Sequence, residues 1–360
     1  MTASVERPLL HWYDKHARDL PWRLPPGAKP PCDPNWPYRV WLSEVMLQQT
    51  TVAAVKPYFE KFTRAWPSVF DLAAAPDEVI MAAWAGLGYY SRARNLIKCA
   101  REVAKLGGFP DTEAELRELP GLGAYTAASI AAIAFGKRAV VVDANVERVV
   151  ARLFLIDEPL PNARKSIRKF AGDITPSERA GDFAQAMMDL GSQVCTTKAP
   201  RCLLCPVSEL CSARVEGEPD RLPIKPARKA KPERRGTAYW IERNKGGQVQ
   251  VWLVRREGSG MLGGMRALPD DGWTARTDGR DKAPLDGEWH DLGTVRHTFS
   301  HAHLSLTVRQ LKSPAAPGSV KDGGGEWWPI EALQDAGLPT LFAKASQLAL
   351  AQRLDKTSAD

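Results

Sequence analysis

A proline-rich basic segment, residues 216–236, divides the 360-residue chain into two parts that differ in hydrophobic period. The segment holds four prolines among its charges and has no apolar periodicity, which is typical of an extended linker. Before it, apolar residues recur at helical spacing, for example over residues 80–87 and 183–190. After it they alternate with polar residues, as over 304–308, which is the period of a half-buried strand.

These periods predict an all-helical domain over residues 1–215, the linker over 216–236 and an α+β domain over 237–360. In the second domain, residues 249–253 and 304–308 are expected to be strands of a small antiparallel or mixed sheet. A content of 44% hydrophobic residues is enough to build a core in each domain.

The formal net charge of +7 is concentrated in one short stretch. Residues 221–235 carry seven bases and one acid, which leaves a net charge of +1 for the rest of the chain. Folded parts with so little net charge must bind any anion through specific local groups. The chain start lacks the apolar run of a secretory signal, and no apolar run approaches the roughly 20 residues of a membrane helix. We therefore expect a cytoplasmic protein with no membrane partner.

Four cysteines near the end of the helical part follow the spacing C-x6-C-x2-C-x5-C: Cys195, Cys202, Cys205 and Cys211. In a reducing compartment such a cluster favours a metal site over disulfides. A structural zinc site of four cysteines usually has two C-x2-C pairs, and this segment has one. The uneven spacing favours a [4Fe-4S] cluster, and leaves open whether the cluster is redox-active or structural.

A glycine-containing break, residues 119–123, separates two predicted helices over 113–118 and 124–135. Gly121 and Gly123 permit a tight turn whose amides lie just before a helix N-terminus, where the helix dipole favours an anion such as a DNA phosphate. The alternative is an ordinary turn between two helices.

Two carboxylates stand in apolar surroundings. Glu44 lies in the apolar run 40–47, where burial would raise its pKa to suit a general acid; the alternative is an outward-facing helical position. Asp143 follows an apolar run and precedes Asn145, a position that also suits a helix N-cap. Two carboxylates in different environments are what cleavage of a glycosidic bond requires.

Taken together in order, these motifs resemble the MutY-type adenine DNA glycosylases of the helix-hairpin-helix, iron–sulfur superfamily, over nearly the whole chain. The residues that carry the resemblance are 11–13 (HWY), 20–23 (LPWR), 40–50 (VWLSEVMLQQT), 86–90 (GLGYY), 119–125 (LPGLGAY), 142–143 (VD), 145–146 (NV), the four cysteines and 299–301 (FSH).

The resemblance implies that the substrate is adenine opposite 8-oxoguanine or guanine in duplex DNA. The adenine would be flipped into a pocket and hydrolysed from its sugar. Glu44 would protonate the adenine ring and help to position water. Asp143 would stabilise the positive charge on the sugar or form a transient bond to it, with Asn145 orienting the site.

The resemblance also assigns residues that would contact DNA. Gln49 and Tyr89 would wedge into the base stack, with Leu87 and Thr50 lining that side. Arg23 and Gln185 are candidates for contacting the flipped adenine, with surface or helix-packing roles as the alternative.

Tyr125 separates subclasses of the superfamily. Endonuclease III-like relatives carry a lysine at this position, whose amine forms a Schiff base with the sugar and leads to strand cleavage. Tyrosine cannot form a Schiff base, so we predict a monofunctional glycosylase that leaves an abasic site.

The second domain resembles the Nudix-like module that this family uses to recognise 8-oxoguanine. Ser300, flanked by Phe299 and His301, is expected to hydrogen-bond the oxidised base. No glutamate occurs between Glu257 and Glu288, so the glutamate-rich metal helix of catalytic Nudix enzymes is missing and nucleotide hydrolysis is disfavoured.

Two other functions compete with adenine excision. An endonuclease III-like lesion glycosylase is opposed by Tyr125 and by the second domain. A non-catalytic lesion-binding protein is opposed by the presence of both Glu44 and Asp143. For adenine excision we expect a monomer, associated with the nucleoid through DNA. One departure from the family is Ala144, where many members have glycine.

Overall fold

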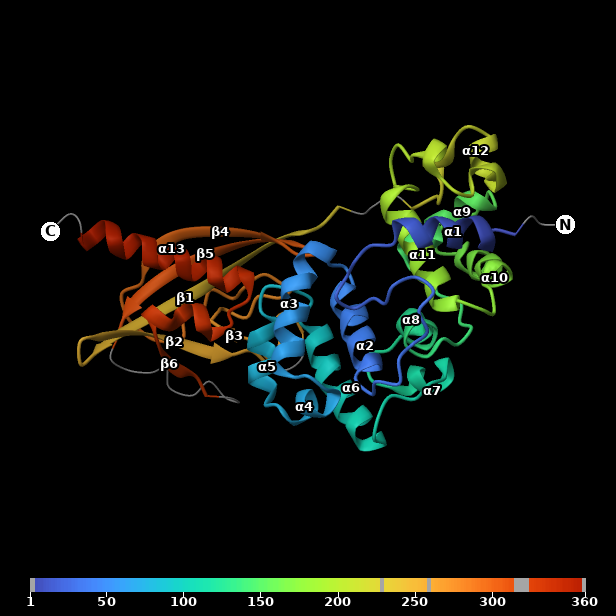
Figure 1. Ribbon diagram of the computed structural model, residues 1–360. Helices are drawn as coiled ribbons and strands as arrows, with labels where there is room; N and C mark the ends of the chain where they lie inside the picture. Colours follow the sequence, from blue (N-terminus) through green and yellow to red (C-terminus); the bar gives the residue numbers. More distant parts are fainter. Residues whose placement is uncertain (1–3, 227–229, 258–259, 314–323, 358–360) are drawn as a thin grey trace. The chain divides into compact units, whose positions relative to one another are not determined.

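The computed structural model describes residues 4–226, 230–257, 260–313 and 324–357 (Figure 1). The chain divides into two compact units. The first unit comprises residues 1–74 and 95–228, and the second comprises 75–94 and 229–360. The division at residue 228 falls inside the segment predicted as a linker. The short segment 75–94 groups with the C-terminal part, although it precedes most of the helical part in sequence.

The first unit is helical, as predicted. Its α-helices are α1 (Glu6–His16), α2 (Trp36–Leu47), α3 (Val52–Ala65), α4 (Val69–Ala74), α6 (Ser91–Leu106, which begins in the second unit), α7 (Glu113–Glu118), α8 (Ala124–Phe135), α9 (Ala144–Leu153), α10 (Arg164–Ile174), α11 (Ala180–Gln193) and α12 (Ser212–Val215). Short 3-10 helices are η1 (Cys202–Leu204), η2 (Ser208–Leu210) and η3 (Pro219–Arg221).

Helix α8 is the centre of the first unit because alanine and isoleucine make it apolar on every side. Residues 126–134 are all buried, and α8 packs against α2, α7 and α11. The helix ends at Gly136, which adopts the left-handed conformation of a C-cap with φ of 66°. A buried central helix of this kind fixes the positions of the helices around it.

The predicted hairpin is present between α7 and α8, with both helices ending where the sequence indicates. Gly121 has φ of 80°, and a Cβ atom there would lie 2.7 Å from Asn95 Cβ. Only glycine meets both conditions. Gly123 is the N-cap residue of α8, so the amides of the turn lie at the start of a twelve-residue helix.

The second unit is built on a six-stranded mixed sheet, which confirms the predicted α+β class. The strands are β1 (Glu233–Lys245), β2 (Gln248–Arg255), β3 (Arg266–Ala267), β4 (His290–Thr298), β5 (His303–Lys312) and β6 (Glu326–Pro329). The order is β3-β2-β1-β5-β4, with β6 also paired to β2. β1 and β5 are parallel and the other pairs antiparallel. The last four residues of the predicted linker, 233–236, belong to β1.

Three helical segments complete the second unit: α5 (Asp77–Trp84), η4 (Ile330–Ala336) and α13 (Thr340–Thr357). Helix α13 packs on β4 and β5, and Phe342 on this helix joins Trp240 and Leu306 of the sheet in one apolar core. Among the described residues, no helix has the length and hydrophobicity needed to cross a membrane.

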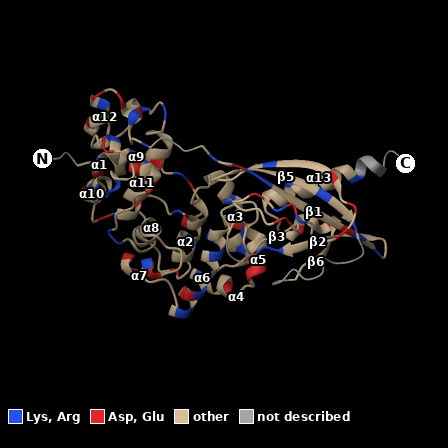
Figure 2. Cartoon of the chain, turned by 180° about the vertical axis from the view of Figure 1, so that it is seen from behind, with Lys and Arg blue, Asp and Glu red and all other residues tan. Residues whose placement is uncertain are grey.

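Acidic and basic residues are interspersed along the helices of the first unit (Figure 2). This distribution agrees with the low net charge outside the basic segment 221–235. Binding of a polyanion would therefore depend on local groups such as the hairpin amides.

Candidate active site

A cavity of about 1010 Å³ in the first unit is lined by residues of α2, α3, α8, α9, α10 and α11 and of the loops before and after α2. The structure brings eight of the predicted site residues to this cavity: Arg23, Glu44, Gln49, Thr50, Tyr125, Asp143, Asn145 and Gln185. They come from segments up to 162 residues apart in the chain, from Arg23 to Gln185, so their convergence is a property of the fold.

Glu44 lies on α2 and is only 5% exposed, so the alternative of an outward-facing position is wrong. Tyr125 Oη donates a hydrogen bond to Glu44 Oε2 at 2.6 Å. Burial raises the pKa of the Glu44 carboxyl, the nearby charge of Asp143 raises it further, and the Tyr125 hydrogen bond opposes the rise. A carboxyl in this environment holds its proton more strongly than an exposed glutamate, which suits a general acid.

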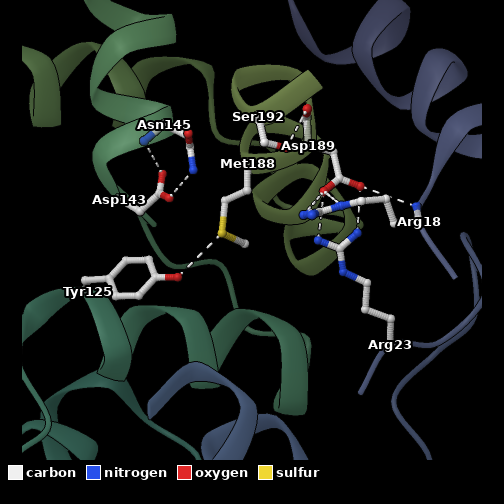
Figure 3. Close-up of polar contacts among 8 residues, drawn as sticks. All are labelled: Arg18, Arg23, Tyr125, Asp143, Asn145, Met188, Asp189 and Ser192. Atoms are coloured by element: carbon white, nitrogen blue, oxygen red, sulfur yellow. Dashed lines mark hydrogen bonds and ion pairs between the residues drawn. The ribbon is translucent and has the colours of Figure 1, made fainter. Parts of the chain in front are cut away.

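Asp143 is the N-cap residue of α9, where its carboxylate faces Asn145 (Figure 3), and it also lines the cavity. Its Oδ1 accepts hydrogen bonds from the backbone N–H groups of Asn145 (2.9 Å) and Val146 (2.7 Å), and Oδ2 accepts from Asn145 Nδ2 at 2.8 Å. The N-cap interpretation is therefore confirmed. Burial raises the pKa of Asp143, and these hydrogen bonds oppose the rise. The carboxylate is held in one orientation relative to the cavity.

Ala144 does not require the freedom of glycine. It is the first residue of α9 and is not among the residues with positive φ. The alanine at this position is therefore compatible with the conformation that places Asp143 and Asn145.

Arg148 lies one turn further along α9 and holds the side-chain amide of Asn145. Its Nη2 donates to Asn145 Oδ1 at 3.0 Å and to the Gly191 carbonyl at 2.5 Å, and its Nε donates to the Cys195 carbonyl at 2.8 Å. The role of Arg148 was not predicted from the sequence, because an arginine in an amphipathic helix usually faces solvent, whereas this one is buried.

Arg23 lines the cavity, and its guanidinium is paired with Asp189, a second residue whose role was not predicted from the sequence (Figure 3). Arg23 donates two hydrogen bonds to the Asp189 carboxylate, at 2.6 and 2.9 Å, and Arg18 donates to the same carboxylate through Nε at 2.7 Å. Asp189 is completely buried. One feature of the sequence indicated this role: Asp189 lies inside the apolar run 186–190 of α11, and a buried charge needs a partner.

Gln185 is buried and lines the cavity, and its Nε2 also donates to the Gly181 carbonyl at 3.3 Å within α11. Met188, one turn further along α11, lies with Sδ 3.5 Å from Tyr125 Oη (Figure 3). The side chain of Tyr125 is thus fixed between α2 and α11, which sets the direction of its hydrogen bond to Glu44.

The two predicted wedge residues share an unusual backbone conformation. Gln49 has φ of 58° and Tyr89 has φ of 49°, both in the left-handed region that non-glycine residues seldom adopt. Such strain is concentrated at functional sites in proteins. Gln49 lies in the first unit, and Tyr89 lies in the second and is 43% exposed, whereas Leu87 is buried.

The four clustered cysteines lie on the chain after α11. Arg152 Nη1 donates to Cys195 Sγ at 3.3 Å and to the Thr196 carbonyl at 2.7 Å. Burial, together with the nearby sulfurs, raises the pKa of Cys205 to about 11. The described residues have no set of three or more Cys, His, Asp or Glu side chains that converges on one ion. A four-iron cluster does not require such convergence, because each cysteine binds a different iron, and the donor set with its buried arginine fits that group.

A second pocket, of about 490 Å³, lies within the second unit. Its lining includes the predicted recognition residues Phe299, Ser300 and His301, together with Tyr89 and Met261. Phe299 packs against His297 with ring centroids 4.5 Å apart and against Trp273 at 6.0 Å. The loop before β5 therefore presents Ser300 from a rigid aromatic support.

Known proteins resemble both parts of the chain. Residues 42–174 match the HhH-GPD superfamily base excision DNA repair proteins, and residues 238–348 match the NUDIX domain. The solved structure of a thermostable thymine-DNA glycosylase has a TM-score of 0.51 to this chain at 30% identity, and the match covers 58% of this chain and 94% of that one. The helical unit with its glycine hairpin thus has the fold of helix-hairpin-helix DNA glycosylases.

Sequence comparison narrows the class further. Human adenine DNA glycosylase is 36% identical over 394 residues, covering 93% of this chain and 72% of the human protein. The adenine DNA glycosylase of Buchnera aphidicola subsp. Baizongia pistaciae is 34% identical over 350 residues, covering 93% and 94%. The chain belongs to the adenine DNA glycosylase family.

Proposed function

We propose that this protein excises adenine paired with 8-oxoguanine or guanine in duplex DNA, by hydrolysing the N-glycosidic bond. The observation that carries the proposal is the pair Glu44 and Asp143, two carboxylates with different hydrogen-bond partners in one cavity. Adenine inside a duplex must be flipped out of the stack to reach a buried pair of this kind.

Glu44 is the general acid of the proposed reaction. Its raised pKa keeps the carboxyl available as a proton donor to the adenine ring, which makes adenine a neutral leaving group. After the bond breaks, the resulting carboxylate can accept a proton from the attacking water. Tyr125 stabilises that carboxylate through its hydrogen bond to Oε2.

Asp143 stabilises the positive charge that develops on the sugar or forms a transient bond to it. Its two backbone hydrogen bonds and the Asn145 amide hold the carboxylate in place before the substrate arrives. This preorganisation avoids reorientation during the reaction. Arg23, held by Asp189, and Gln185 would contact the flipped adenine.

The product is an intact strand with an abasic site. No lysine stands at position 125, and the phenol of Tyr125 cannot form a Schiff base with the sugar. Strand cleavage then needs an added base or another enzyme.

Binding of the mispair would be shared by three local features. The hairpin amides around Gly121 and Gly123 would bind a DNA phosphate at the start of α8. Gln49 and Tyr89 would enter the base stack, with Thr50 and Leu87 beside them. Ser300, with Phe299 and His301, would recognise 8-oxoguanine. The protein would act as a monomer on duplex DNA.

We also propose that Cys195, Cys202, Cys205 and Cys211 hold a [4Fe-4S] cluster. Bound there, the cluster would cross-link a loop that has little secondary structure of its own. Arg152, through Cys195 Sγ and the Thr196 carbonyl, anchors the start of this loop to α9.

Release of free adenine tests the proposal directly. A duplex with adenine opposite 8-oxoguanine is incubated with excess protein, and the base is quantified by mass spectrometry. We expect stoichiometric adenine from this duplex and none from one with cytosine opposite 8-oxoguanine. Tight binding without adenine release would instead indicate a lesion-binding protein.

A further inference from the structure

One contact in the pocket of the second unit has no role in the proposed function. Met261 Sδ lies 3.0 Å from His301 Nε2, and Ser300 Oγ lies 3.1 Å from His301 Nδ1. The imidazole of His301 therefore connects a thioether on one loop to the hydroxyl of Ser300 on another.

The thioether determines which ring nitrogen carries the hydrogen. Sulfur in methionine has no hydrogen to donate, so in a hydrogen bond with Met261 the hydrogen must be on His301 Nε2. In the neutral imidazole, Nδ1 then has a lone pair. The hydroxyl of Ser300 must donate its hydrogen to Nδ1, and its oxygen offers only lone pairs to a ligand in the pocket.

The local structure holds these three side chains in place. Leu262, next to Met261, has φ of 58°, a left-handed conformation that leucine seldom adopts, and Gly260 and Gly264, with φ of 87° and 79°, supply the conformations that this turn needs. The rings of Phe299 and His301 are nearly parallel, with an interplanar angle of 16° and centroids 6.4 Å apart. The imidazole thus lies parallel to an aromatic neighbour of the same loop.

An acceptor-only hydroxyl distinguishes two purines that differ at N7. Guanine has a lone pair at N7, whereas 8-oxoguanine in its keto form has a hydrogen there. The Ser300 oxygen can accept the N7–H of the oxidised base, but it would face the N7 lone pair of guanine with a lone pair of its own.

We propose that Met261 is a positioning residue that sets lesion specificity. It holds His301 in the Nε2–H tautomer, and this makes Ser300 a hydrogen-bond acceptor that selects a purine with a hydrogen on N7. The inference rests on the proposed function of the pocket as the 8-oxoguanine site.

The tautomer of His301 is measured first, in the wild-type protein at about pH 8. Long-range 1H–15N NMR correlations distinguish the two neutral imidazole tautomers, and the His301→Gln spectrum identifies the signal. We expect the Nε2–H form. The Nδ1–H form as the main species would overturn the proposal without any variant of Met261.

Specificity is then measured as a ratio of dissociation constants. The duplexes carry 2′-fluoro-2′-deoxyadenosine, which resists hydrolysis, opposite 8-oxoguanine, guanine or 8-bromoguanine. The last base is substituted at C8 but keeps the N7 lone pair. The wild-type protein should prefer 8-oxoguanine over both other bases.

Met261→Leu removes the sulfur acceptor and keeps an apolar side chain of similar size. The preference for 8-oxoguanine over 8-bromoguanine should fall about tenfold, the change that one neutral hydrogen bond makes to an equilibrium. Met265→Leu is the matched control. Met265 lies on the same segment, is 1% exposed and does not line the pocket, so the preference should stay at the wild-type value.

Ser300→Ala separates failure of this inference from failure of the proposed function. If Ser300→Ala lowers the preference and Met261→Leu leaves it intact, the pocket recognises 8-oxoguanine and the role of Met261 is wrong. If Ser300→Ala leaves the preference intact, the pocket is not the recognition site, and the proposed roles of Ser300 and Met261 are both wrong, whereas adenine excision by the Glu44–Asp143 cavity is tested separately by adenine release.

Discussion

The two pockets of this protein place polar side chains in opposite environments. In the first unit, Glu44 is 5% exposed, and Asp189, which pairs with the cavity residue Arg23, is fully buried; each has hydrogen-bond partners from distant segments of the chain. In the second unit, Ser300 and His301 are exposed on a loop. Removal of water from a carboxyl raises its pKa, so a general acid is best buried. Recognition of a base in DNA depends on hydrogen bonds to the edge of the base, so the side chains that make them must be accessible. The buried pocket is suited to chemistry and the exposed one to recognition.

Glu44→Gln should produce the largest effect, because it removes the proton donor and keeps the shape of the side chain. We expect excision to slow by about 10²–10⁴-fold, the usual contribution of a general acid, with binding of the mispair retained. Single-turnover rates and binding assays measure the two properties separately. Glu102→Gln, on the exposed surface of α6 beside Lys105, is the control and should have wild-type rates.

Asp143→Asn tests whether the second carboxylate acts through its charge or only as a helix cap. Asparagine is as good an N-cap as aspartate, so the melting temperature should change little. Excision should slow by about 10²-fold or more, because a neutral amide cannot stabilise a cationic sugar. A variant with nearly normal excision would reduce Asp143 to its capping role.

Cys202→Ser should affect the first unit as a whole and leave the second unit intact. Loss of one cysteine ligand would destabilise a [4Fe-4S] cluster, bleach its visible absorbance and lower the melting temperature by about 2–4 °C for each kcal/mol lost. Cys99→Ser, at a buried cysteine of α6 outside the cluster segment, should keep the absorbance. Equal absorbance in wild type and Cys202→Ser would contradict the assignment.

Ser300→Ala should separate recognition from chemistry. The preference for 8-oxoguanine over guanine opposite adenine should fall about tenfold, as expected for the loss of one hydrogen bond. The maximal excision rate should stay near the wild-type value, because Ser300 and Glu44 belong to different pockets. An equal loss of activity on both substrates would count against a role in recognition.

The smallest expected effect is a pH-dependent gain in stability from Glu44→Gln. The folded-state pKa of Glu44 lies above its ordinary value, so the contribution of this carboxyl to stability is complete below the unfolded-state pKa and is lost as the pH rises through the folded-state pKa. The neutral amide does not suffer this loss. Thermal unfolding should therefore show the variant more stable than wild type at about pH 8, with a smaller difference at about pH 5. A difference independent of pH would contradict burial as the cause.

The sequence predicted those parts of the site that depend on residues close to one another in the chain. The apolar run of α8 and the glycines before it predicted the hairpin, and the position of Asp143 predicted an N-cap. The burial of Glu44 was not evident from its own helix, because α2 becomes enclosed only when α8 packs against it. Asp189 was missed for a similar reason, since its partner Arg23 lies 166 residues away.

The central claim is that the Glu44–Asp143 cavity releases adenine and leaves the strand intact. It is tested most directly by a single-turnover incubation of the purified protein with a labelled duplex carrying adenine opposite 8-oxoguanine, analysed with and without alkali. We predict strand cleavage only after alkali, which reveals an abasic site. Cleavage without alkali would indicate a lyase and contradict the role of Tyr125, and no cleavage under either condition would contradict adenine excision itself.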